Sequence, residues 1–423
     1  MLGNKLTLHD LTSKQLGGKR VVMRVDYNVP FGKDGKISNN QRIEATIPTI
    51  NEIFEKGANS IVLLSHLGRP DGKKVDKYSL RPVAEKLQEL IKKPVTFIDE
   101  CVGPKVDAAV KAPAKGSIIL LENVRFHIEE EGSVKDKDGN KIKADPAKVK
   151  EFREHLTSYG DVYINDAFGT AHRAHSSMVG VELPIRAAGN LIKRELDAFV
   201  PIVESPRKPL LSILGGAKVT DKIKLINNLL DKVDEMIITG AMVYTFMKVG
   251  FNAKIGASRF DEEGAKIVPE LLQKAKDKGV QLHLCKDYLC GDKFAEDAQV
   301  KTFSLEEGIP DGWMGLDAGP ETVKDYQAAI GRANTIIWNG PCGVYEWEHF
   351  QKGTRDTLEA CAAAKARGAL VVIGGGDCGA CAMKWGYADK LSHISTGGGA
   401  SLQLLEGGEM PGLSHLSDKS SLK

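Results

Sequence analysis

The sequence has almost no net charge and few cysteines for its length. Its 58 Lys and Arg against 56 Asp and Glu leave a formal charge of +2 over 423 residues, which argues against a general nucleic-acid or anionic-membrane surface. The seven cysteines are odd in number and scattered, so we expect reduced thiols in the cytosol rather than a disulfide scaffold. Any basic binding site must therefore be local.

Long apolar runs and internal repeats are missing as well. No stretch approaches the roughly 18 apolar residues of a membrane span, and the first residues lack the basic and apolar regions of an export signal. No repeat with a period of roughly 20–50 residues is present, so a solenoid or propeller is not expected. A chain of 423 residues exceeds one ordinary hydrophobic core, and we expect two domains.

What the sequence does contain is a series of short apolar runs that are typical of buried parallel strands. Stretches with helical spacing lie between them, such as the one from Ile43 to Phe54. This alternation of strands and helices predicts the α/β class. The predicted strands are Arg20–Val25, Ser60–Leu64, Ser117–Leu121, Asp161–Ile164, Leu210–Leu214, Glu235–Thr239, Thr335–Trp338, Ala369–Ile373 and Leu391–Ile394.

A domain boundary is predicted between Leu183 and Pro209. Small residues there precede a predicted helix from Ile192 to Val203, which ends before Pro206. We interpret this helix as the link between the domains. The polar segment Glu129–Asp145 is interpreted as a solvated surface excursion instead of a boundary.

Arginines follow the predicted strands of the first half. Ligands of open α/β sheets bind beyond the carboxyl ends of the strands, and Arg69, Arg125 and Arg173 lie after strands while Arg42 opens a helix. A guanidinium matches phosphate and carboxylate oxygens bidentately. Each arginine alone could be a surface ion-pair partner, but their recurrence predicts a site for a small phosphorylated acid. His66 is a further candidate.

Glycines follow the predicted strands of the second half. Backbone N–H groups at such turns bind phosphates, and a neighbouring lysine adds a positive charge, so this half is predicted to hold a polyphosphate. Asp377 could hold Mg²⁺ together with phosphate oxygens or cap a helix, and both can hold at once. The glycine-containing turns are Gly215–Lys218, Gly240, Gly340–Gly343, Gly374–Asp377 and Gly397–Gly399.

Several alternative interpretations remain open at this point. Gly374, Gly376 and Gly379 satisfy the G-x-G-x-x-G pattern, which suggests an NAD-dependent dehydrogenase, although the acidic residue expected about 20 positions later is missing. A non-catalytic sensor of phosphorylated metabolites is a second alternative. The C-x-x-C formed by Cys378 and Cys381 is interpreted as incidental thiols. Neither a Walker A motif nor a zinc site is expected.

Taken in order, a series of motifs resembles the phosphoglycerate kinase family from about Lys5 to Gly412, with loop lengths similar to its eukaryotic members. These motifs are Val25–Pro30, Ser65–Pro70, Leu121–Phe126, Gly169–His175, Gly215–Lys218, Trp338–Pro341, Gly374–Asp377 and Ser395–Ala400.

The resemblance implies two Rossmann-like, doubly wound parallel-sheet domains joined by a hinge helix. Residues 1–188, with a returning tail at 405–423, would bind 3-phosphoglycerate, and residues 189–404 would bind Mg-nucleotide. It implies reversible phosphoryl transfer between 1,3-bisphosphoglycerate and ADP, giving 3-phosphoglycerate and ATP, in the cytoplasm. A monomer is the default expectation.

The resemblance also implies roles for individual residues. The acid would be bound by Asp26, Asn28, Arg42, His66, Arg69, Arg125 and Arg173. The nucleotide would be bound by Gly216, Ala217, Lys222, Gly240, Gly315, Leu316, Pro341, Gly343, Val344, Glu346, Gly375, Gly376, Asp377 (with Mg²⁺) and Cys378. Catalysis would use Arg42, Lys218, Gly376 and Gly399. Departures from the family pattern, which leave nucleotide affinity and base preference open, are Thr239, Ala241, Arg259, Cys342 and Cys378.

The chemistry of such a reaction constrains its mechanism. A carboxylate acceptor is already ionised at neutral pH, so no general base is needed. Positioning and neutralisation of the transferring phosphoryl charge remain, for which Lys218, Arg42 and the glycine turns are suited. Since the two ligands would lie on different domains, hinge closure is predicted.

Overall fold

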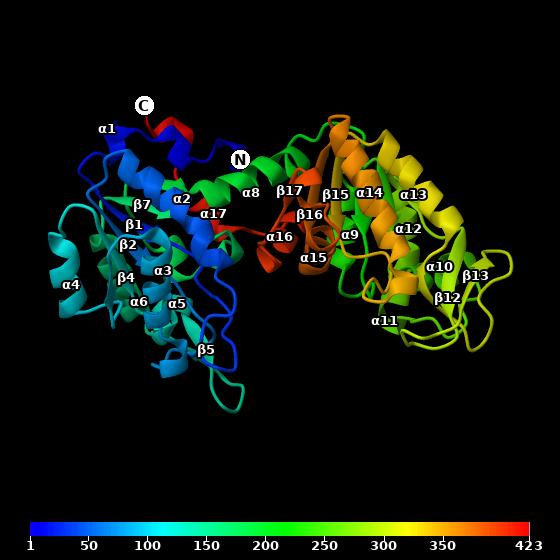
Figure 1. Ribbon diagram of the computed structural model, residues 1–423, viewed down its shortest axis with the longest axis horizontal. Coiled ribbons are helices and arrows are strands. Elements are labelled where there is room, and N and C mark those ends of the chain that lie inside the picture. The colour runs from blue at the N-terminus through cyan, green and yellow to red at the C-terminus, as the bar shows by residue number, and fades with distance from the viewer. Residues whose placement is uncertain (423) are drawn as a thin grey trace. The chain divides into compact units, whose positions relative to one another are not determined.

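A computed structural model describes residues 1–422 of the chain, which divides into two compact units (Figure 1). The first contains residues 1–197 and 409–422, and the second contains Ala198–Gly408. The division lies within helix α8 (Asn190–Val203). The boundary predicted after residue 188 falls just before this helix. Within the described part of the chain, no helix combines the length and apolarity needed to cross a bilayer.

Helix α8 begins where a buried carboxylate accepts the first helical N–H groups. The Leu191 N–H donates to Asp166 Oδ1 at 2.8 Å, and the Thr49 hydroxyl donates to Asp166 Oδ2 at 2.7 Å. A carboxylate at a helix N-terminus satisfies otherwise unpaired donors. The start of α8 is therefore fastened to the first unit.

The first unit is built on a six-stranded sheet in which all neighbouring strands are parallel. Across the sheet the strands are β3 (Val95–Ile98), β4 (Ser117–Leu121), β2 (Ser60–Leu64), β1 (Arg20–Arg24), β7 (Val162–Asn165) and β8 (Arg186–Ala188). Strands β2, β3 and β4 lie on one side of β1, and the later strands β7 and β8 lie on its other side. The β1/β7 junction is therefore the switch point, where ligands are expected.

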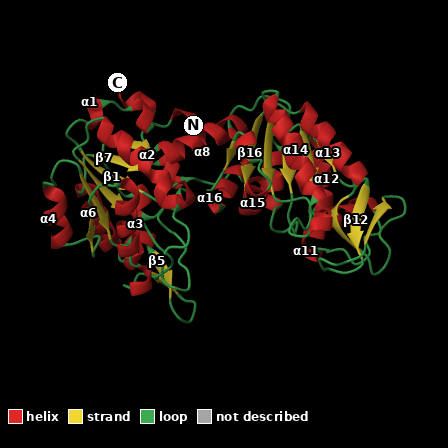
Figure 2. Cartoon of the chain, in the orientation of Figure 1, coloured by secondary structure: helices red, strands yellow, loops and turns green. Residues whose placement is uncertain are grey.

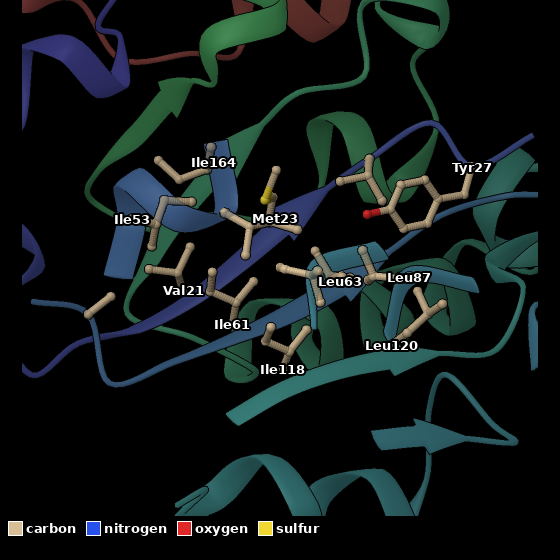
Figure 3. Packing of buried hydrophobic residues seen from close by; sticks show 14 of the residues in the cluster. Val21, Met23, Tyr27, Ile53, Ile61, Leu63, Leu87, Ile118, Leu120 and Ile164 are labelled. Carbon is tan, nitrogen blue, oxygen red and sulfur yellow. The ribbon is translucent and has the colours of Figure 1, made fainter. Parts of the chain in front are cut away.

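Alternate residues of neighbouring strands form the core of the first unit. Met23 on β1 lies in register with Leu63 on β2 and Ile164 on β7. These side chains, together with Ile61 and Ile118, are buried and point into one apolar layer (Figure 3). Burial of such strands on both faces explains why they are continuous apolar runs in the sequence.

The second unit contains another six-stranded parallel sheet. Its strands, across the sheet, are β11 (Gln281–His283), β10 (Glu235–Ile238), β9 (Leu210–Leu214), β15 (Thr335–Asn339), β16 (Leu370–Gly374) and β17 (His393–Ile394). In chain order this is the 3-2-1-4-5-6 arrangement of doubly wound dinucleotide folds, with its switch point between β9 and β15. The predicted fold class is confirmed.

Helices surround each sheet (Figure 2). In the first unit they are α1 (Ser13–Leu16), α2 (Gln41–Glu55), α3 (Arg81–Ile91), α4 (Pro104–Lys111), α5 (Ile128–Glu131), α6 (Pro146–Ser158), α7 (Ser176–Val179) and α17 (Pro411–Ser414). In the second they are α9 (Ile223–Leu230), α10 (Val243–Phe251), α11 (Glu262–Ala265), α12 (Val268–Asp277), α13 (Pro320–Arg332), α14 (Lys352–Ala366), α15 (Gly376–Lys384) and α16 (Gly399–Leu405).

Two small antiparallel sheets are present that the sequence did not indicate. One is the hairpin of β5 (Ser133–Lys135) and β6 (Lys141–Lys143). The other has the order β13 (Val300–Ser304), β12 (Asp287–Gly291) and β14 (Met314–Ala318). Their strands carry polar residues and lack the long apolar runs of the parallel strands, so the apolar pattern gave no signal.

The segment Glu129–Asp145 is only partly the solvated excursion that its composition predicts. The hairpin is mostly exposed, but the preceding residue Glu130, in α5, is 1% exposed. The prediction is wrong at this residue because Glu130 pairs with a buried arginine.

The C-terminal segment returns to the first unit. The Leu6 N–H donates to the Ser417 carbonyl at 2.7 Å, and the Ser417 N–H donates to the Arg186 carbonyl at 2.8 Å. Lys5 and Asp418 form an ion pair at 3.2 Å. The two ends of the chain are therefore joined to each other and to strand β8.

Candidate active site

Basic side chains gather at the carboxyl end of the first sheet. His66 follows β2 and is 5% exposed. Burial, followed by the positive charges of Arg24 and Arg125 and smaller contributions from His175 and Arg42, holds the pKa of His66 well below 6.5. These charges act on His66 only because the segments that carry them converge.

Arg125 extends the cluster toward two further predicted residues. Its pKa is lowered by burial, partly offset by Glu131, and further lowered by the charges of Arg24 and Arg69. Its Nη1 donates to the Gly68 carbonyl at 3.0 Å, whereas its buried Nε lies 3.9 Å from Glu131 Oε1 and has no hydrogen-bond partner among the described residues. A guanidinium donor without a hydrogen bond favours an anionic ligand at this position.

Arg42 is held at the edge of the cluster by two other predicted residues. Its Nη1 contacts Asp26 Oδ1 at 3.2 Å and donates to the Asn28 carbonyl at 2.9 Å. The Asn28 side-chain oxygen in turn accepts from the Gly68 N–H at 2.9 Å. Arg42 retains free donors because these contacts use only one of its nitrogens.

Arg173 completes the set of predicted arginines. Burial is the main cause that lowers the pKa of His175 to about 3, and the positive charges of Arg125, Arg24 and Arg173 add to this shift. Across residues 1–422, neither Arg69 nor Arg173 forms an ion pair, and both are exposed. The structure therefore brings the four predicted arginines and His66 to one region.

A buried network beneath this cluster was not predicted from the sequence. Arg24 is fully buried, and its Nη2 lies 3.8 Å from Glu130 Oε2 and 3.1 Å from His66 Nδ1. Ser177 joins the two charges, because its hydroxyl accepts from Arg24 Nε at 2.7 Å and donates to Glu130 Oε2 at 2.6 Å. No motif signals this network, since its members lie far apart in the chain.

The network fixes the protonation of His66. Arginine has only donors, so the Nδ1 atom that faces Arg24 must be the acceptor of a neutral ring. The remaining proton of that ring then lies on Nε2. His66 is thereby set as a neutral hydrogen-bond donor, in agreement with its lowered pKa.

These histidines predict a fall in stability on acidification. Their pKa values in the folded chain lie below 6.5, so below that pH the unfolded chain takes up protons that the folded chain does not, and the free energy of unfolding decreases. His175→Asn should reduce this decrease between about pH 7.5 and about pH 5.5, measured by urea unfolding. His349→Asn, an exposed histidine elsewhere, is the matched control. An equal pH slope in wild type and His175→Asn would contradict the assignment.

In the second unit, glycine turns meet at the switch point between β9 and β15. The Gly215 N–H donates to the Asn339 carbonyl at 2.8 Å. Gly340 has a φ of +96°, and a Cβ there would lie 2.2 Å from the Gly215 oxygen. Gly240 has a φ of +70°, and a Cβ there would lie 2.7 Å from the Gly216 nitrogen. Only glycine allows the three strand ends to come this close.

A cavity of about 600 Å³ opens beside these turns. Of the residues predicted to bind nucleotide, those lining it are Gly216, Ala217, Gly240, Gly315, Leu316, Pro341, Gly343, Val344, Glu346 and Asp377. Lining residues that sequence reasoning did not assign to the site are Tyr244, Ala257, Phe294, Met314 and Tyr345. Phe294 and Met314 belong to the unpredicted antiparallel part of the unit, which explains why they were missed.

Four other predicted nucleotide residues do not line this cavity. Gly375 and Gly376 lead from β16 into α15, and a Cβ at Gly376 would meet open space. Lys222 donates to the Asn339 side-chain oxygen, and burial lowers its pKa despite nearby negative groups that include Asp377. Cys378 is 1% exposed, so its side chain packs in the core. Gly399, predicted to be catalytic, is the first residue of α16.

Asp377 and Lys218 provide opposite charges in this region. Asp377 lines the cavity, and its Oδ1 accepts from the Tyr345 hydroxyl at 3.2 Å. A carboxylate oxygen beside a phosphate-sized space fits Mg²⁺, which prefers hard oxygen ligands. Lys218 is exposed and has no hydrogen bond or ion pair within the described chain. Its ammonium group is therefore free to meet an anion.

Comparison with known proteins agrees with this geometry. The sequence matches the profile described as "Phosphoglycerate kinase" over residues 9–408. It is 60% identical to "Probable phosphoglycerate kinase" of Caenorhabditis elegans, over 98% of each chain, and 57% identical to "Phosphoglycerate kinase 1" of Homo sapiens, over 99% of each. The solved phosphoglycerate kinase of Coxiella burnetii is 36% identical with a TM-score of 0.85, covering 97% of this chain and 98% of that one. The chain belongs to the phosphoglycerate kinase family.

Proposed function

We propose that this chain transfers a phosphoryl group reversibly between 1,3-bisphosphoglycerate and ADP, giving 3-phosphoglycerate and ATP in glycolysis. The observation that carries this proposal is that one chain contains both a guanidinium cluster at the β1/β7 switch point and a glycine-lined cavity at the β9/β15 switch point. Membership of a family of phosphotransferases supports it. The first site suits a small phosphorylated acid, and the second suits a nucleotide polyphosphate.

The first unit would bind and orient the acid without proton transfer. The carboxylate of 3-phosphoglycerate is ionised at neutral pH and attacks as it stands. His66 would donate Nε2–H to the acid, while Arg69, Arg125 and Arg173 neutralise its charge. Asp26 and Asn28 would act by holding Arg42 at the edge of the cluster. This division separates binding groups from those that meet the transferring phosphoryl group.

The second unit would hold the nucleotide with its phosphates toward Asp377. Asp377 would be a ligand of Mg²⁺, which when bound neutralises charge on the nucleotide phosphates. Lys218 would meet the transferring group, and the N–H groups that begin α15 and α16, at Gly376 and Gly399, would stabilise its oxygens. Lys222 would assist as a point charge near the phosphates.

Transfer in line requires the two ligands to approach each other and water to leave. Because each unit would bind one ligand, we expect closure about α8 when both are present. The prediction is a smaller radius of gyration, by small-angle scattering, with MgATP and 3-phosphoglycerate together than with either alone. An unchanged radius in the doubly liganded sample would contradict closure.

A coupled assay tests the function itself. ATP, Mg²⁺ and 3-phosphoglycerate should yield ADP and an acyl phosphate, which a reducing enzyme converts with loss of NADH absorbance. Omission of 3-phosphoglycerate is the control for ATP hydrolysis. Absence of acyl phosphate from folded protein would reject the proposal.

We also propose a reducing compartment such as the cytoplasm, a monomeric state, and no nucleic-acid or membrane partner. All seven cysteines are free and buried, which fits a cytoplasmic chain. The near-zero net charge fits the absence of a general polyanion surface.

A further inference from the structure

The nucleotide cavity contains one side chain whose chemistry differs from its surroundings. Among the described residues that line the cavity, Arg259 is the only cation. It is exposed and, across residues 1–422, makes no hydrogen bond or ion pair. A free guanidinium beside a ligand cavity has all its donors available.

The backbone places Arg259 beside strand β14. The Ala257 N–H donates to the Trp313 carbonyl at 2.8 Å, and the Gly315 N–H donates to the Ser258 hydroxyl at 2.8 Å. These bonds tie the segment before Arg259 to the antiparallel sheet. Asp377 and the glycine turns, by contrast, come from the ends of the parallel strands.

The part of the cavity near β14 is apolar and aromatic. Met314 and Leu316 of β14 line it together with Tyr244 and Phe294. Phe294 is 67% exposed, with its ring centroid 4.8 Å from that of Trp347. Aliphatic and aromatic surfaces of this kind hold a planar base. The base of a nucleotide whose phosphates lie toward Asp377 would therefore occupy this end.

We propose that Arg259 contacts the edge of the base and raises kcat/KM for 6-oxopurine nucleotides, such as GDP and GTP, relative to that for ADP and ATP. The proposal rests on the proposed function, since it places the nucleotide in this cavity. Guanine presents two adjacent acceptors, O6 and N7, to which an arginine donates bidentately, whereas adenine pairs its N7 with an amino donor. The chemistry is unchanged: the P–O bond to the acyl oxygen breaks, and a P–O bond to the terminal oxygen of GDP forms.

The test compares kcat/KM for four diphosphates in the acyl phosphate-consuming direction. GDP and IDP carry O6, ADP carries an amino group there, and 2-aminopurine riboside diphosphate carries neither. Arg259→Leu should lower kcat/KM for GDP and IDP by about tenfold to a hundredfold, the range for one bidentate base contact, and leave the values for ADP and the 2-aminopurine nucleotide within about twofold. Arg259→Lys keeps the positive charge but loses the bidentate guanidinium geometry. It should recover only part of the lost kcat/KM for GDP and IDP.

Lys276→Leu removes one exposed positive charge at the end of α12, away from the cavity lining, and serves as the matched control. The proposal is overturned if the ratio of kcat/KM for GDP to kcat/KM for ADP is the same in Arg259→Leu as in wild type. An equal loss of kcat/KM with all four nucleotides, or no turnover of GDP by wild type, overturns it as well. Calorimetry with GDP and ADP gives their dissociation constants for the same variants. These constants show whether Arg259 contacts the base even if turnover with ADP fails. Failure of the base contact is thus distinguishable from failure of the proposed function.

Discussion

Lys218→Ala should lower kcat by a hundredfold or more while the dissociation constant of ADP changes little. The reason is that the free Lys218 ammonium would contact the phosphoryl group chiefly while it is transferred, and loss of one such preorganised charge costs about 10²–10³ in rate. Interactions made only in the transition state appear in kcat rather than in binding. Steady-state kinetics with calorimetric ADP binding measures both quantities.

Three comparison variants sharpen this result. Lys224→Ala removes an exposed lysine of the neighbouring helix α9 and should leave kcat unchanged. Arg69→Ala should mainly raise KM for 3-phosphoglycerate, because Arg69 is assigned to acid binding, whereas Arg42→Ala should resemble Lys218→Ala. Nearly normal turnover of Lys218→Ala would remove Lys218 from the mechanism.

Glu130→Leu should be the most destabilising single change at the acid site. It leaves the fully buried guanidinium of Arg24 without its counter-charge, and breaking a buried ion pair in this way costs about 3–5 kcal/mol. Ser177 would also lose the acceptor of its N–H and hydroxyl, which contact Glu130 at 2.7 and 2.6 Å. Urea unfolding gives the free energy change.

The double variant Arg24→Met with Glu130→Leu is the matched control. Removing both charges leaves no unpaired ion, so it should recover much of the lost free energy of unfolding. It should still bind 3-phosphoglycerate more weakly, because His66 loses the partner of its Nδ1. If the double variant were as unstable as Glu130→Leu alone, packing rather than the unpaired charge would explain the loss.

The parallel sheets were predictable because their strands are buried on both faces. The apolar runs of β1, β2, β4 and β9 coincide with their predicted ranges to within one residue. Strands β3 and β11 were missed because exposed side chains interrupt their apolar pattern, and β8 was missed because its three residues lie in the stretch interpreted as a domain boundary. The antiparallel strands were missed for the same reason, and with them the Phe294 and Met314 end of the cavity.

The candidate site was predictable where chemistry repeats at strand ends. Arginines after the first-half strands and glycines after the second-half strands signal two anion sites before any contact is known. The Arg24–Glu130–Ser177 network gave no such signal, because three residues of different types meet only through the fold. Gly374 ends β16, Gly376 begins α15 and Gly379 lies within α15, yet family membership excludes the dehydrogenase alternative that their spacing suggested.

The pairing of Leu6 with Ser417 makes the second unit an insertion within the first. During synthesis, residues 198–408 leave the ribosome before the segment that closes β8 is available, since a chain emerges from its N-terminus. The later unit can therefore complete its own sheet while the earlier one still lacks its final segment. Termination before Ser417 would leave the Leu6 N–H and the Arg186 carbonyl without this partner, although both parallel sheets would already have been translated.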